Sequence, residues 1–222
     1  MEASIEGVVA HGDGTGLAVI QWASALLYNG LGRYEDALAA AERASGRPHD
    51  PTRVLPELIE AAIRCGMTER AVEALEGLSD TTRASGTDWG FGIEARSRAL
   101  LSDGEAAERL YREAIKRLAR TRVRVELARA HLLYGEWLRR ERRRLDARKQ
   151  LRIARELFTR VGMEAFAERA RVELEATGEH ARKRAAHTRD DLTPQEAQIS
   201  RLAAEGARNR EIAAQLFISP ST

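Results

Sequence analysis

Small and apolar residues recur along residues 17–160 with a period that drifts from 34 to 40 positions. The first two copies share the sequence Gly-x-Tyr/Thr-x-x-Ala and begin at Gly32 and Gly66. Within each copy, apolar residues return every three or four positions, which is the spacing of one buried helix face. Each copy therefore predicts two amphipathic helices joined by a tight turn, and the Gly-x-Tyr/Thr-x-x-Ala sequence lets the first helix end on glycine. The alanines that mark the second helix of each pair are Ala37, Ala71, Ala107 and Ala147.

These helical pairs resemble the tetratricopeptide repeat, closely in the first two copies and in a degenerate form in the next two. One hairpin cannot bury its apolar face alone, so neighbouring pairs are expected to stack into a solenoid. A last helix is predicted over residues 163–176, where Phe166, Ala170 and Leu174 form one apolar stripe and Val172 stands beside it. This helix would cap the solenoid.

The pattern changes after residues 178–191, a polar segment without an apolar stripe that we interpret as a linker. The string from position 192 reads LTPQEAQISRLAAEGARNREIAAQLFISPST, and its Thr193 can cap a helix ahead of a proline. A second helix is predicted to begin after Asn209, and a third at Ser219. Two short helices, a turn and a new helix start are typical of a helix-turn-helix.

This string closely resembles the start of the LuxR-type helix-turn-helix domain, and the repeats before it resemble the helical region of large LuxR-family regulators. The resemblance implies a transcriptional regulator whose repeats relay a signal. In such regulators a nucleotide-binding domain precedes the repeats. The terminal domain, when complete, would bind promoter DNA as a dimer. In the family, the recognition helix that reads the major groove begins at the position of Ser219. Only its first turn is present, so specific DNA binding is expected to be lost. The residues left for weak phosphate contacts are Asn209, Arg210, Ser219, Ser221 and Thr222.

The predicted architecture is therefore all-α: a tetratricopeptide-like helical repeat domain over 1–177, a linker over 178–191, and an incomplete helix-turn-helix domain over 192–222. The composition is consistent with a folded protein, because 43% hydrophobic and 32% charged residues allow a packed core. No run of about 18 apolar residues occurs, so no membrane association is expected. The start lacks the pattern of a signal peptide, and a single cysteine excludes an internal disulfide. These features predict a cytoplasmic protein.

Charge is uneven along the chain, with a net charge of −6 over residues 1–100 and +8 over residues 101–222. The densest basic run, residues 139–152, holds eight basic residues. Such a run could meet nucleic-acid phosphates or an acidic partner. We interpret it as a solvated helix face with i,i+4 ion pairs, since almost no aromatic residues interleave to stack on bases.

Signals of catalysis are absent from the sequence, which has no HExxH, CxxC, G-x-S-x-G or P-loop motif. The glycine-rich residues 12–16 lack a phosphate-binding lysine and are interpreted as a loop or a turn between repeats. His131 is predicted to be packed or solvated, and Cys65 to be a small buried residue. We expect no enzyme activity, no cofactor and no metal site. The tryptophans expected to pack between helices are Trp22, Trp89 and Trp137.

The alternative function is a helical-repeat scaffold for protein–protein interaction that does not bind DNA. The concave face of stacked hairpins is the usual binding surface of such proteins. In this interpretation the basic residues 139–152 would meet an acidic protein partner.

Overall fold

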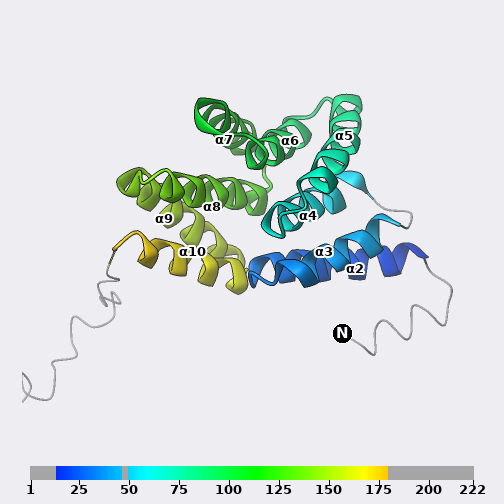
Figure 1. The fold of residues 1–222 in the computed structure, drawn as a ribbon, viewed down its shortest axis with the longest axis horizontal. Helices are drawn as coiled ribbons and strands as arrows, with labels where there is room; N and C mark the ends of the chain where they lie inside the picture. The colour runs from blue at the N-terminus through cyan, green and yellow to red at the C-terminus, as the bar shows by residue number, and fades with distance from the viewer. Residues whose placement is uncertain (1–13, 47–49, 180–222) are drawn as a thin grey trace, which may run out of the picture. The chain divides into compact units, whose positions relative to one another are not determined.

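The described part of the protein is built from α-helices. A computed structural model describes residues 14–46 and 50–179, and no strand occurs within these ranges (Figure 1). The predicted all-α class is confirmed. By its internal contacts the chain divides into two units, residues 1–179 and 180–222, and every described helix lies in the first. In chain order the helices are α2 (Gly14–Gly30), α3 (Tyr34–Ser45), α4 (Pro51–Arg64), α5 (Thr68–Ser85), α6 (Asp88–Leu100), α7 (Gly104–Ala119), α8 (Arg124–Arg140), α9 (Arg144–Val161) and α10 (Glu164–Ala176).

Consecutive helices pack as pairs, α2 with α3, α4 with α5, α6 with α7 and α8 with α9, and α10 packs on α9. The predicted glycine turn forms in the first two pairs, where Gly32 and Gly66 have φ of +71° and +76°. Glycine suits this left-handed conformation because it has no Cβ to clash with the backbone. In the α8–α9 turn, Arg142 occupies the position that Gly32 has in the first pair, five residues before the marker alanine, here Ala147. Arg142 adopts the left-handed conformation with φ of +61°. This turn therefore carries backbone strain that the first two avoid.

Paired helices approach most closely at small residues. A Cβ built on Gly135 of α8 would lie 2.7 Å from Cγ of Leu151 in α9. A Cβ on Gly92 of α6 would lie 2.6 Å from Cγ of Leu118 in α7. Real Cβ atoms do not come so close to a neighbour, so these crossings need glycine. The four alanines that mark the repeats, Ala37, Ala71, Ala107 and Ala147, are all fully buried.

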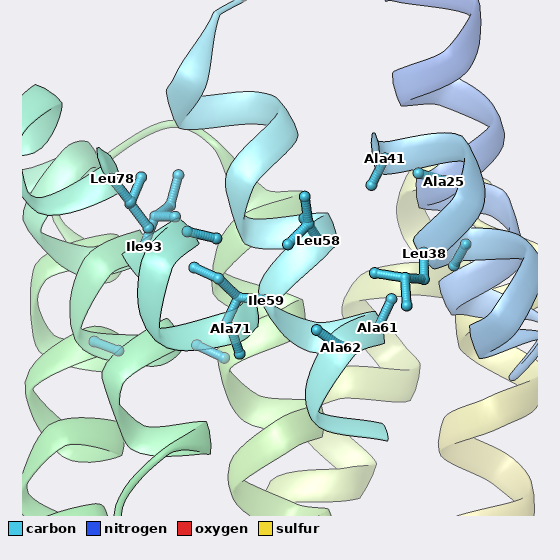
Figure 2. Close-up of a cluster of buried hydrophobic side chains, with 14 of the residues drawn as sticks. Ala25, Leu38, Ala41, Leu58, Ile59, Ala61, Ala62, Ala71, Leu78 and Ile93 are labelled. Carbon is cyan, nitrogen blue, oxygen red and sulfur yellow. The ribbon is translucent and has the colours of Figure 1, made fainter. Parts of the chain in front are cut away.

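Two overlapping apolar clusters connect the pairs. In the first, Leu58 and Ile59 of α4 lie between Leu38 of α3 on one side and Ile93 of α6 on the other (Figure 2). The second runs from α6 to α10 and includes stacked aromatic rings of α7, α8, α9 and α10. Each pair thus shares its core with the next one, as stacked hairpins require.

The last helix confirms its predicted position, since α10 begins at Glu164 and buries the stripe of Phe166, Ala170 and Leu174. Val172, beside that stripe in the sequence, is 50% exposed. The glycine-rich start departs from the expected loop, because α2 already begins at Gly14. Packing of the helix on α3 and α4 outweighs the low helix propensity of these glycines.

The first and last described helices also meet. Figure 1 shows α10 beside the end of α2, and the two helices are in contact. A Cβ on Gly30 would lie 2.8 Å from Cδ2 of Phe166, so the ring packs directly on the last residue of α2. An open stack of hairpins would leave its two ends apart, whereas here they touch.

Candidate functional sites

A group of charged side chains lies buried between α4, α8 and α10. We call it the central ionic cluster; its members are Glu57, Glu60, Arg64, Arg129, Glu136 and Arg169. The members on α4 share one face because they are spaced by three and four positions. Glu57, Glu60 and Glu136 are at most 2% exposed, and Arg129 is 1% exposed. The three negative charges equal the three positive charges in number, and buried charges are stable only when they are paired in this way.

Arg169 connects four helices through its guanidinium. Its Nε and Nη2 donate to the two carboxylate oxygens of Glu136 in α8, at 2.7 and 3.0 Å. Its Nη1 donates to Glu60 Oε1 in α4 at 2.7 Å and to the backbone oxygen of Asn29 in α2 at 2.9 Å. A forked contact with a carboxylate is geometrically specific, so this one side chain fixes α10 against α2, α4 and α8.

Arg129 of α8 connects its helix to α4. It donates to both carboxylate oxygens of Glu57, and its Nη2 lies 2.7 Å from Glu60 Oε2. Asn29 adds a hydrogen bond from Nδ2 to Glu57 Oε2 at 2.9 Å. Arg64 closes the cluster by donating to Glu136. Every carboxylate in the cluster therefore accepts hydrogen bonds from at least one arginine.

The electrostatics keep Glu60 and Glu136 ionised. Burial alone would raise the pKa of Glu60, but Arg169 and Arg129 outweigh it and hold that pKa well below its ordinary value. The pKa of Glu136 is lowered in the same way by Arg169 and Arg64, against burial. A general acid or base needs a pKa near the working pH. The cluster therefore connects helices rather than transferring protons.

Sequence reasoning missed this cluster, although one signal was present. Residues 127–138 are mostly apolar in the sequence and are all buried in the structure, and the charged Arg129 and Glu136 lie among them. A charged residue within a buried run requires a partner of opposite sign. The sequence could show that a partner was needed, but the partners lie far away along the chain.

The basic residues 139–152 divide into two groups. Four arginines hold partners on other segments: Arg139 binds Glu173, Arg143 binds Glu108, Arg148 binds the backbone oxygen of Thr177, and Arg152 binds Glu179. Local pairing is limited to Arg143 with Asp146. The expected i,i+4 pattern is therefore wrong for this run, since tertiary contacts supply most of the carboxylates. The exposed residues without an ion pair to any described residue are Arg140, Arg142, Arg144 and Lys149.

The other polar candidates are packing residues. His131 is buried, its Nδ1 lies 2.7 Å from Oε1 of Gln150, and burial lowers its pKa. The prediction that Cys65 is buried is wrong, because this residue at the end of α4 is only partly buried. Desolvation still raises the pKa of its thiol, which disfavours the reactive thiolate. Trp137 is buried in the aromatic stack with Tyr134. Within residues 14–46 and 50–179, no group of three or more His, Cys, Asp or Glu side chains could hold a metal ion.

The residues predicted to touch DNA lie outside the described residues, as does most of the linker over 178–191. They are Asn209, Arg210, Ser219, Ser221 and Thr222. Among the described helices, none is long and apolar enough to cross a membrane.

Comparison with known proteins bears on this last part of the chain. Residues 190–222 match the family model of bacterial regulatory proteins of the luxR family. No curated protein and no solved structure matches the chain. The match indicates a DNA-binding transcription regulator, and it follows a helical region over residues 14–179. Residues 190–222 are therefore similar to the luxR family of bacterial regulatory proteins.

Proposed function

We propose that the protein is a LuxR-type transcription regulator in which helical repeats relay a signal to a DNA-binding segment. The proposed organisation is a tetratricopeptide-like repeat domain over 1–177, a linker over 178–191 and a helix-turn-helix over 192–222. The observation that carries the proposal is the family match at residues 190–222. The paired helices with glycine turns support the repeat assignment.

Contact with DNA is assigned to the start of the second helix of the DNA-binding segment. Backbone N–H groups at a helix start favour phosphate, and Arg210 adds a positive side chain beside Asn209. Ser219, Ser221 and Thr222 supply hydroxyl donors to the same backbone. These contacts position the segment on the duplex and carry no sequence information themselves, so recognition of a particular promoter in this proposal also needs the rest of the recognition helix that begins at Ser219 in the family.

Chromatin immunoprecipitation in the source cells tests the proposal on the native protein. An antibody raised against residues 50–179 should enrich discrete promoter fragments that are not enriched from a strain lacking the gene. Arg210→Gln should weaken the enrichment, because it removes a phosphate contact. Arg83→Gln, which removes the same charge from an exposed position on α5, should leave it unchanged. Absence of any enriched promoter would refute the assignment as a DNA-binding regulator.

A second measurement tests the phosphate contact itself. Affinity for a promoter fragment found in that experiment is measured as a function of salt concentration. The slope of log affinity against log salt should become shallower by about 0.9 in Arg210→Gln, because the variant neutralises one phosphate fewer. An unchanged slope would show that Arg210 does not face the DNA backbone.

A further inference from the structure

A cleft of about 440 Å³ lies between α7 and α9. Its deepest lining comes from α8, where His131, Tyr134 and Leu138 are buried. Ile115 of α7 and Ile153 of α9 are partly buried and form apolar walls. Clefts of this size with apolar walls and a few polar groups are typical of sites for small molecules.

The rim of the cleft is strongly basic. Four basic residues line it, two on α7 and two on the α9 side: Arg112, Lys116, Arg143 and Lys149. The only acidic residue in the lining is Asp146, and Arg143 already holds it, with Nη2 2.8 Å from Oδ2. The cleft therefore carries an excess of positive charge.

Lys116 and Lys149 account for that excess, because neither forms an ion pair with a described residue. Each has a carboxylate three positions earlier on its own helix, which is within reach of a helical ion pair. Glu113 is already bound by Arg117 at 2.5 Å, and Asp146 by Arg143. Two exposed ammonium groups thus stand at the rim of an apolar cleft without a counter-charge among the described residues.

We infer that this cleft binds a small organic anion, with its charged head between Lys116 and Lys149 and its apolar body against Ile115 and Ile153. An uncharged apolar molecule would leave the ammonium groups unused. An inorganic anion would leave the apolar walls exposed to water. A ligand with both parts uses the charge and the apolar surface together.

His131 leaves the buried lining of the cleft uncharged, so the positive charge of the site lies at its rim. As placed, Oε1 of Gln150 can only accept, so Nδ1 of His131 carries the proton. Burial lowers the pKa of His131, so the ring is neutral at pH 7 and adds no charge to the buried lining. The apolar body of the ligand therefore meets a neutral surface.

Methyl NMR on the full chain tests the inference with octanoate as the probe. The δ1 methyl signals of Ile115 and Ile153, assigned through Ile→Val variants, should shift in a saturable way with a dissociation constant below about 1 mM. Octan-1-ol and octylammonium at the same concentrations should not saturate the site. Equal binding of octan-1-ol would overturn the assignment to an anion, and unmoved Ile115 and Ile153 signals would overturn the site.

A pair of matched variants separates the cleft from general surface charge. Lys116→Ala with Lys149→Ala should weaken octanoate binding at least tenfold. Arg109→Ala with Arg155→Ala removes two exposed positive charges from the same two helices outside the cleft and should leave binding unchanged. Exposed alanine is favourable in a helix, so both variants should fold. Equal affinities of the two variants would refute the role of the lysines.

Discussion

Replacing Arg169 by methionine should cost the repeats about 3 kcal/mol of stability, at the lower end of the 3–5 kcal/mol seen when one partner of a buried ion pair is removed. The substitution removes two hydrogen bonds to Glu136, one to Glu60 and one to the backbone of Asn29. Both carboxylates stay buried, which is the source of the penalty. The cost lies at the low end because Glu136 keeps Arg64 and Glu60 keeps Arg129.

Urea unfolding followed by tryptophan fluorescence measures this loss in the full chain. All three tryptophans lie within residues 1–179, so the signal reports on the repeats alone. Arg171→Met is the matched control, since Arg171 lies on the same helix and pairs only with the more exposed Glu168 and Glu175. Exposed pairs contribute little, so the control should change stability far less. Equal effects of the two substitutions would refute the structural role of the cluster.

The effect of Arg169→Met should also depend on pH. The pKa values of Glu60 and Glu136 are lowered in the folded state, although burial opposes this, because Arg169 and its neighbours favour the charged form. Their contribution is therefore present above the ordinary carboxyl pKa of 4.5 and is lost as the pH falls below it. The stability gap between the native chain and the variant should narrow as the pH falls below 4.5. A gap that widened in acid would contradict this assignment.

Three further substitutions give stability changes that the same unfolding assay measures. Gly135→Ala should destabilise the protein by about 1 kcal/mol, because overpacking against Leu151 outweighs the gain in helix propensity. At Gly77 the nearest atom to an added Cβ is 3.4 Å away, so Gly77→Ala should stabilise the protein by about 1 kcal/mol. If both changes had the same sign, the close α8–α9 crossing would be wrong. Arg142→Gly should stabilise by about 1 kcal/mol by relieving the left-handed turn, and a loss would contradict that strain. Tyr111→Phe should stabilise by about 1 kcal/mol, since the buried hydroxyl has no hydrogen-bond partner in the described part of the chain; a loss would reveal a missing partner.

Much of the fold could be predicted because it is encoded locally. The repeat period located the buried alanines, and the glycine turns at Gly32 and Gly66 form as the pattern indicates. The stripe of Phe166, Ala170 and Leu174 located the last helix within one residue of its start. In each case a spacing of a few residues specifies both the helix and its buried face.

The central ionic cluster could not be predicted in the same way. Arg129 and Glu57 are 72 positions apart, and Arg169 contacts Asn29 across 140 positions. No periodicity within a single repeat relates such residues. The α7–α9 cleft depends on side chains from three helices, so its residues also come together only in the fold.

The contact between α10 and α2 changes how the repeats should unfold. An array in which each repeat touches only its neighbours can fray from either end, one unit at a time. Here Arg169 fastens the last helix to the first pair, so neither end can detach without exposing buried charge. The repeats should therefore unfold in one cooperative transition, and fold more slowly than an open array of equal length because contacts between distant residues must form. Loss of α10 would therefore weaken α2 as well as its neighbour α9.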